Sequence, residues 1–283
     1  MFPSRAPIGI FDSGVGGLSV MREIRFLMPS ESVLFFADQE HVPYGLRSLE
    51  EVRAFSEEIT RFLLGLGAKL VVVACNTASA AALHHLRRTF LKTSFVGMEP
   101  AVKPAAESTH TGVVGVLATP ATFQGALYAS VVERFASGVT ILQDTCPGLV
   151  GQIEKGELDS SATRDILENA LRPMLKQGID TVVLGCTHYP FVIPLIKQIV
   201  GPEVRVIDPA PAVARQTARL LDAEGLRESG SRSAVLRFFT SGEAARFDSC
   251  LPRLLGEAGE VQQIIWSGNK IQPLDASNLP ITS

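Results

Sequence analysis

Short runs of β-branched and aromatic residues alternate with amphipathic stretches along this 283-residue chain. Such alternation is typical of parallel α/β architecture, in which helices pack against the faces of a sheet whose strands are buried. The predicted strands cover residues 8–11, 33–37, 70–74, 114–118, 139–142, 181–185, 204–208, 234–241 and 262–266. The sequence therefore predicts an α/β fold with mainly parallel sheets.

One helix can be placed from its own signals. Ser48 and Glu51 have the spacing of a capping box, and Gly65 and Gly67 supply stop signals. The apolar residues between them share one helical face: Val52, Phe55, Ile59, Phe62, Leu63 and Leu66. Another helix is expected near 243–256.

An internal repeat indicates two related units. GIFDSG at 9–14 aligns with GVLATP at 115–120, and LVVVACNT at 70–77 aligns with TVVLGCTH at 181–188. The offsets, 115 − 9 = 106 and 181 − 70 = 111, are nearly equal. We expect two similar α/β domains that face each other with pseudo-twofold symmetry. Loop-like composition at 97–112 and 208–212 marks the crossings, which assigns 1–97 plus 208–283 to the first domain and 98–207 to the second.

Charge and composition exclude several classes of protein. The 26 basic and 29 acidic residues give a net charge of −3 without a basic stripe, so no nucleic-acid partner is expected. The longest apolar run, 70–75, is far too short for a membrane span. The first strand begins at Ile8, which leaves no room for a signal peptide, so we expect a cytoplasmic protein. No Cys-x-x-Cys pair is present, and no metal site is expected.

Two of the four cysteines hold positions suited to chemistry. Cys75 and Cys186 each follow a predicted strand directly and precede a helix, at equivalent places in the repeat. Ligands of open α/β sheets bind at these strand ends. Two thiols facing one cleft can remove a proton from one side of a carbon acid and return it on the other, which inverts the stereocentre. Cys146 and Cys250 lack this placement and are expected to be structural.

Polar residues flank the same strand ends. Asp12 and Ser13 follow the first strand, Asn76 and Thr77 follow Cys75, and Thr187 and His188 follow Cys186. Hydroxyl and amide groups bind carboxylates, Asp12 could receive an ammonium or assist a thiol, and His188 could move a proton. The same residue types also cap helices, and both roles are compatible.

A dinucleotide-binding turn is a competing interpretation of FDSGVGGLSV. Gly14 and Gly16 follow a strand, and Asp38 ends the next strand where a ribose ligand would lie. Ser19 occupies the third glycine position, however, and Asp12 would place a negative charge beside the pyrophosphate. A P-loop is excluded because no Gly-Lys-Ser/Thr follows.

Five segments together resemble the bacterial glutamate racemases of the aspartate/glutamate racemase superfamily. They are IGIFDSGVGGLSV, PYG at 43–45, VVACNTAS at 72–79, VVLGCTHYP at 182–190 and FFTSG at 238–242. The resemblance implies a cofactor-independent, cytoplasmic and dimeric racemase that supplies D-glutamate for peptidoglycan, with its active site in the cleft between two α/β domains.

The resemblance also implies roles for individual residues. It assigns acid/base catalysis to Cys75 and Cys186, with Asp12, His188 and Glu154 as further catalytic groups. It assigns glutamate binding to Asp12, Ser13, Pro43, Tyr44, Gly45, Asn76, Thr77, Thr187 and His188. One loop departs from the family: relatives commonly have Asp-Thr-Ala-Arg where this chain has Asp38-Gln39-Glu40-His41, so no role can be carried over to residues 39–41.

Two alternatives remain open. An aspartate racemase of the same superfamily would differ in the depth of the cleft and not in its catalytic groups. A two-domain module that binds a small anion without converting it would need the hydroxyls and helix termini but not two apposed thiols.

The sequence contains no recognisable cradle for pyridoxal phosphate or a nucleotide. We therefore predict that the protein keeps full racemase activity after dialysis against a chelator, and that it does not absorb at wavelengths longer than the protein band. Activity that is lost on dialysis and restored by pyridoxal phosphate or a metal would contradict a mechanism that needs only two thiols.

Overall fold

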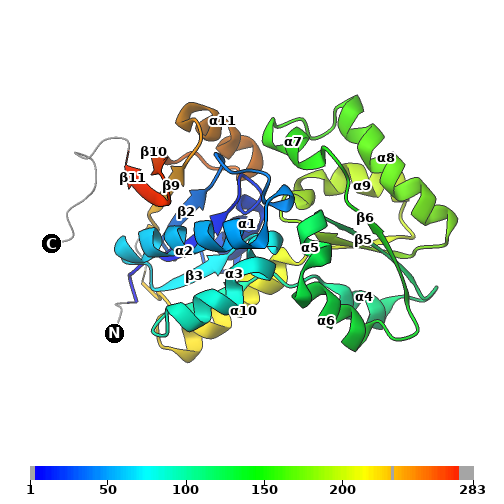
Figure 1. Cartoon of the computed structure of the whole chain (residues 1–283), viewed down its shortest axis with the longest axis horizontal. Coiled ribbons are helices and arrows are strands. Elements are labelled where there is room, and N and C mark those ends of the chain that lie inside the picture. The colour runs from blue at the N-terminus through cyan, green and yellow to red at the C-terminus, as the bar shows by residue number, and fades with distance from the viewer. Residues whose placement is uncertain (1–3, 231–232, 274–283) are drawn as a thin grey trace.

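The computed structural model describes residues 4–230 and 233–273, and places two α/β units side by side (Figure 1). The parts of the first predicted domain at 1–3, 231–232 and 274–283 lie outside the described residues. The strands within each unit are parallel except for β10 and β11, which pair antiparallel. The predicted fold class, two α/β units with mainly parallel sheets, is confirmed.

The first unit is built on a seven-stranded sheet in the order β11-β10-β9-β2-β1-β3-β4. Its strands are β1 (Ile8–Asp12), β2 (Val33–Ala37), β3 (Leu70–Val73), β4 (Ser94–Gly97), β9 (Leu236–Thr240), β10 (Glu260–Ser267) and β11 (Lys270–Pro273). Its helices are α1 (Leu18–Leu27), the short η1 (Tyr44–Leu46), α2 (Leu49–Gly65), α3 (Asn76–Thr89), α10 (Ala210–Ala223) and α11 (Ala244–Leu254).

The second unit is built on a four-stranded sheet in the order β6-β5-β7-β8. Its strands are β5 (Val113–Ala118), β6 (Thr140–Asp144), β7 (Thr181–Gly185) and β8 (Arg205–Ile207). Its helices are α4 (Val102–Ser108), α5 (Pro120–Gln124), α6 (Ala126–Phe135), α7 (Leu149–Glu154), α8 (Ser161–Lys176), η2 (Tyr189–Val192) and α9 (Ile193–Val200).

The two sheets share one strand order. The sequence β2-β1-β3-β4 in the first corresponds to β6-β5-β7-β8 in the second. The repeat aligned β1 with β5 and β3 with β7, and these are the two central strands of each set. In this order the chain turns in opposite directions after the first and third strands, so a crevice opens between their carboxyl ends. The topology therefore provides one binding position in each unit.

Alternate side chains of the buried strands enter different cores. In the first sheet, Ile10 and Phe35 pack with α1, α10 and α11, whereas Phe11 and Phe36 pack with α2 and α3 on the other face. In the second sheet, α4 and α6 cover one face, and α7, α8 and α9 cover the other. Because helices cover both faces of each sheet, the central strands β1, β2, β3 and β7 are buried along their whole length.

The structure corrects several local predictions. The stretch 97–112 was expected to be a loop, but it contains α4, and α10 begins at Ala210 within the loop predicted at 208–212. Pro104 and Pro211 both lie in the first turn of a helix, where proline is tolerated. The predicted capping box of Ser48 and Glu51 is present at the start of α2. The domain boundaries themselves stay a prediction.

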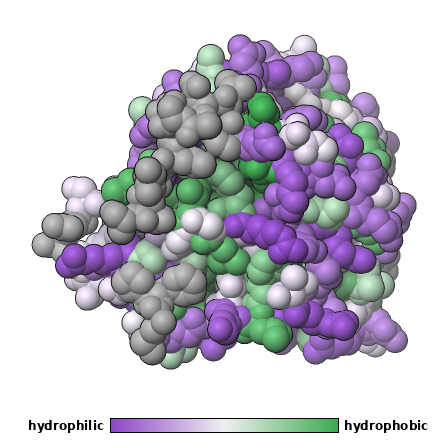
Figure 2. All heavy atoms as spheres, turned by 60° about the vertical axis from the view of Figure 1, so that its left-hand side comes forward, coloured by the Kyte–Doolittle hydropathy of each residue, from purple (hydrophilic) through white to green (hydrophobic). Residues whose placement is uncertain are grey.

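The surface is a mosaic of polar and apolar residues. The face shown in Figure 2 is largely hydrophilic, with apolar residues gathered toward its middle. Across the part of the chain that the structure describes, no helix is long and apolar enough to span a membrane.

A buried ion pair ties the base of the first sheet together. Lys69 Nζ lies 2.6 Å from Glu31 Oε2, and both side chains are almost fully buried. The ammonium also donates to the carbonyls of Ser4 and Leu226, and Glu31 accepts the backbone N–H of Glu228. The pair thus joins four segments of the first unit: the one at Ser4, the loop before β2 that holds Glu31, the start of β3 next to Lys69, and the segment after α10.

Replacing one member of this pair leaves the other charge buried and uncompensated. We predict that Lys69→Met lowers the free energy of unfolding by about 3–5 kcal/mol. The double variant Lys69→Met/Glu31→Leu should recover much of that loss, as measured by urea unfolding. A single variant as stable as the wild type would show that the pair does not hold these segments.

Candidate active site

A small cavity lies where the carboxyl ends of both sheets meet. It is lined from the first unit by Ser13, Pro43, Tyr44, Gly45, Cys75, Asn76 and Thr77, and from the second by Thr119, Val150, Gly185, Cys186, Thr187 and His188. Its volume is about 20 Å³, room for about one water molecule. An amino acid is larger than this, so the walls must move apart to admit one.

Cys75 follows β3 and is the N-cap of α3. The residue is 5% exposed, and its Sγ accepts a hydrogen bond from the backbone N–H of Ala78 at 3.5 Å. Burial, reinforced by the nearby Asp12 carboxylate, raises the pKa of Cys75 well above its ordinary value. This thiol therefore holds its proton at neutral pH unless a base takes it.

Cys186 follows β7 and has a different neighbour. Its Sγ lies 3.8 Å from His188 Nδ1, and His188 Nε2 lies 2.6 Å from Glu154 Oε1. Burial alone would lower the pKa of His188, but the hydrogen bonds to Cys186 and Glu154 outweigh it and raise this pKa well above its usual value. Burial opposes ionisation of Glu154 too, yet its contacts with His188 lower its pKa overall. The pair is therefore an imidazolium and a carboxylate at neutral pH, with the cation beside Cys186.

Asp12 ends β1 and is fully buried behind the cavity wall. Its Oδ2 accepts the backbone N–H of Gly17 at 2.8 Å, and its Oδ1 accepts the hydroxyl of Thr187 at 3.4 Å. Burial raises the pKa of Asp12, and the positive charge of His188 opposes that shift. The Asp12 carboxyl and the Cys75 thiol that it faces are therefore both harder to ionise than in water.

The glycines of the first turn let these groups approach the backbone. A Cβ at Gly14 would overlap the Glu154 carboxylate, and one at Gly16 would overlap the His188 ring. At Gly17 a Cβ would come within 2.7 Å of the Cβ of Asp12. The glycine pattern that could have indicated a dinucleotide turn thus makes room for side chains of the chain itself.

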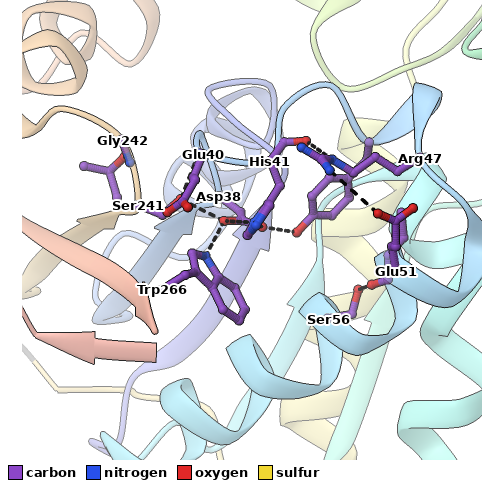
Figure 3. Close-up of polar contacts among 12 residues, drawn as sticks. Asp38, Glu40, His41, Arg47, Glu51, Ser56, Ser241, Gly242 and Trp266 are labelled. Atoms are coloured by element: carbon purple, nitrogen blue, oxygen red, sulfur yellow. Dashed lines mark hydrogen bonds and ion pairs between the residues drawn. The ribbon is translucent and has the colours of Figure 1, made fainter. Parts of the chain in front are cut away.

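Polar contacts gather around the buried Asp38 (Figure 3), and one of them holds Tyr44, which lines the cavity. The buried Asp38 carboxylate accepts the Tyr44 hydroxyl at 2.6 Å, the Ser241 hydroxyl at 2.7 Å and the Trp266 indole N–H at 2.8 Å. The His41 ring lies 2.9 Å from Asp38 and stacks on Phe55. Trp266 of β10 and Ser241 after β9 therefore support, through Asp38, the part of the cavity wall that Tyr44 forms.

The wall of the cavity carries unsatisfied and bridging polar groups. Both polar atoms of the Asn76 side chain are buried without a hydrogen-bond partner within the described residues. Such groups are costly unless a ligand or water satisfies them.

Thr77 and Thr119 bridge the two units through their hydroxyls, 2.9 Å apart. In residues 4–230 and 233–273, no three His, Cys, Asp or Glu side chains are grouped as metal ligands.

The structure brings all the sequence-predicted site residues together at this seam. Asp12 and Glu154 stand one layer behind the lining residues, and the others line the cavity. Cys146 is buried in the core and Cys250 is partly buried, and neither lines the cavity. Sequence reasoning missed Thr119, although it aligns with Ser13 in the internal repeat, a signal that could have identified it. It also missed Gln39, which donates to Glu154.

Comparison with known proteins identifies the family. The model of the Asp/Glu/hydantoin racemase family matches residues 13–217. The glutamate racemase of Ectopseudomonas mendocina is 51% identical over 261 residues, which cover 92% of this chain and 99% of that protein. The chain belongs to the Asp/Glu/hydantoin racemase family.

Solved structures of members of this racemase family have the same fold. The Bacillus anthracis glutamate racemase isoform RacE1 gives a TM-score of 0.82 at 34% identity, covering 94% of this chain and 99% of that one. The Escherichia coli glutamate racemase, solved with L-glutamate and the activator UDP-MurNAc-Ala, gives 0.82 at 33% identity, covering 93% and 100%. The protein is therefore an amino-acid racemase in fold and family.

Asp12→Asn tests whether the charge behind Cys75 takes part in racemisation. Asparagine can still accept from Gly17 N–H through its oxygen and contact Thr187 through its amide, so the fold should persist. We expect turnover to fall by about 10²–10⁴-fold, the range typical of a lost acid/base group. Steady-state kinetics together with thermal unfolding measure both quantities, and near-normal turnover would make Asp12 only a cap of the turn.

Proposed function

We propose that this protein interconverts L- and D-glutamate by proton transfer at Cα, with Cys75 and Cys186 as acid/base groups on opposite sides of the substrate. One observation carries the proposal: two thiols at equivalent strand ends of two similar units open on a single cavity. A binding module has no need of this arrangement, whereas inversion of a stereocentre requires a proton donor opposite a proton acceptor.

Each thiol has a different partner for its proton. Asp12 is placed to take the proton of Cys75, because its buried carboxyl lies against the thiol and burial raises the pKa of that carboxyl. On the other side, the His188 imidazolium lies beside Cys186 and stabilises the negative charge that forms on sulfur when Cys186 gives up its proton. Glu154 keeps His188 charged through the 2.6 Å contact. The cysteine that has become a thiolate then removes the α-proton, and the other cysteine, still a thiol, delivers its proton to the opposite face of the resulting carbanion.

The remaining wall supplies groups suited to an amino-acid zwitterion. The unpartnered Asn76 amide and the hydroxyls of Ser13, Thr77, Thr119 and Thr187 can bind carboxylate oxygens. The amino end of α3 adds the positive end of a helix dipole next to Cys75. Pro43, Tyr44 and Gly45 form the wall that the Asp38 network supports.

Similarity to known proteins favours glutamate over aspartate as the substrate. Curated relatives that are 49–51% identical over about nine-tenths of the chain are glutamate racemases. From the same family resemblance we propose a role in supplying D-glutamate for peptidoglycan, independence of cofactors, a cytoplasmic location and a homodimer.

Polarimetry of the purified protein with L-glutamate and with L-aspartate tests the proposal. We expect optical rotation to decay to zero with L-glutamate and to stay constant with L-aspartate. The reverse pattern would make the protein an aspartate racemase. Constant rotation with both amino acids, together with binding of either one, would indicate a binding module.

Single cysteine variants should divide the reaction into its two halves. Cys75→Ser and Cys186→Ser should each abolish racemisation, because a hydroxyl is too weak an acid to replace the thiol. Elimination from a glutamate analogue with a leaving group on nitrogen needs only the first proton removal. By the family resemblance, Cys75 serves D-glutamate and Cys186 serves L-glutamate. Cys186→Ser should therefore process only the D-analogue, and Cys75→Ser only the L-analogue.

The outcomes are distinct. Swapped preferences would reverse the assignment of thiols to enantiomers and leave the mechanism standing. If either variant processed both enantiomers equally well, the assignment of one cysteine to each face of the substrate would be wrong.

A further inference from the structure

Gln39 lies in the loop between β2 and η1. Its side chain is fixed at both ends. Nε2 donates to Glu154 Oε2 at 2.9 Å, and Oε1 accepts the Thr240 hydroxyl at 2.9 Å. The Thr240 oxygen in turn accepts the backbone N–H of Gly242 at 3.0 Å. Because a carboxylate only accepts hydrogen bonds, these contacts determine which end of the amide faces Glu154.

Gln39 also completes the hydrogen bonding of a buried carboxylate. Glu154 is 7% exposed, and its Oε1 is occupied by His188 Nε2 and by the backbone N–H of Val15 at 2.8 Å. Within the described residues, the Gln39 amide is the one donor to Oε2. The two donors from the first unit, Val15 and Gln39, therefore determine the orientation of a carboxylate that belongs to the second.

We infer that Gln39 is a positioning residue for racemisation, which holds Glu154 against His188 and so keeps the imidazolium beside Cys186. The inference rests on the proposed function. It acts through Glu154 on the Cys186 side of the cavity, because no hydrogen bond connects Gln39 to Cys75 or Asp12 in the described part of the chain. Loss of the amide should therefore slow the proton transfer at Cys186 more than the proton transfer at Cys75, which His188 affects only through its charge on Asp12.

Kinetic isotope effects can detect such one-sidedness, whereas turnover alone cannot. Gln39→Met keeps the length of the side chain and removes both hydrogen-bonding groups. We expect kcat to fall by about 10- to 100-fold, the effect of losing a hydrogen bond to a charged group. With α-deuterated substrates, the isotope effect on kcat/KM should rise for the enantiomer that Cys186 deprotonates, because that step becomes more rate-limiting. It should fall for the other enantiomer.

Two further variants separate donation from space filling. Gln39→Glu keeps the shape and the contact with Thr240 but places a carboxylate opposite Glu154, so its kcat should fall further than that of Gln39→Met. Glu40→Gln is the matched control: Glu40 is the exposed next residue, and only its backbone N–H is hydrogen-bonded among the residues described. It should behave as the wild type does.

The enantiomer with the raised isotope effect should be the one that Cys75→Ser still processes in the elimination assay. Wild-type kcat in Gln39→Met, or isotope effects that change equally for both enantiomers, would overturn the positioning role. Failure of the wild type to racemise glutamate would instead overturn the proposed function, so the two failures are distinguishable.

Discussion

The polarity of the central strands is the constraint on which the rest of the molecule depends. In each sheet the first and third strands run parallel and side by side, and the chain leaves them in opposite directions. Asp12 and Cys75 lie at the carboxyl ends of one such pair, and Thr119 and Cys186 lie at those of the other. Because the carboxyl ends of both pairs meet at one seam, the segments after these four strands, together with residues 43–45 and Val150, line a cavity to which both units contribute. The strand topology thus determines where the functional side chains meet, and the side chains then determine the chemistry at that place.

The two halves of the site share a backbone plan and differ in electrostatics. Cys75 faces a buried carboxyl whose pKa is raised, whereas Cys186 faces an imidazolium whose pKa is raised by its own partners. Burial of the charged forms of Asp12, Glu154 and His188 in one seam would cost much free energy if each stood alone. Here Glu154 compensates His188, and the positive charge of His188 in turn favours the ionised form of Asp12. The repeat therefore provides two equivalent positions for sulfur, and the residues behind each thiol make the positions unequal.

The sequence predicted most of this arrangement because its signals are local. Buried strands, the capping box of α2 and the strand-end cysteines are each encoded within a few residues, and the repeat indicated which ends belong together. α4 was missed because proline in a first turn reads like a loop. Thr119 was missed although the repeat aligned it with Ser13. The roles of Trp266 and Ser241 around Asp38 could not be predicted, since they join residues more than 200 positions apart and no local pattern records that contact.

Access to the cavity and assembly of the site depend on the same contacts. Val15 and Gln39 reach from the first unit to Glu154 in the second, Ser19 donates to the Thr187 carbonyl, and Thr77 meets Thr119. The cavity has room for about one water, so its walls must move apart before an amino acid can enter. A movement that separated the units would remove the Val15 and Gln39 donors from Glu154 and so weaken its support of His188. In the proposed mechanism, the contacts that close the cavity are therefore the same contacts that hold the acid/base groups in place, and both thiols are buried in this arrangement.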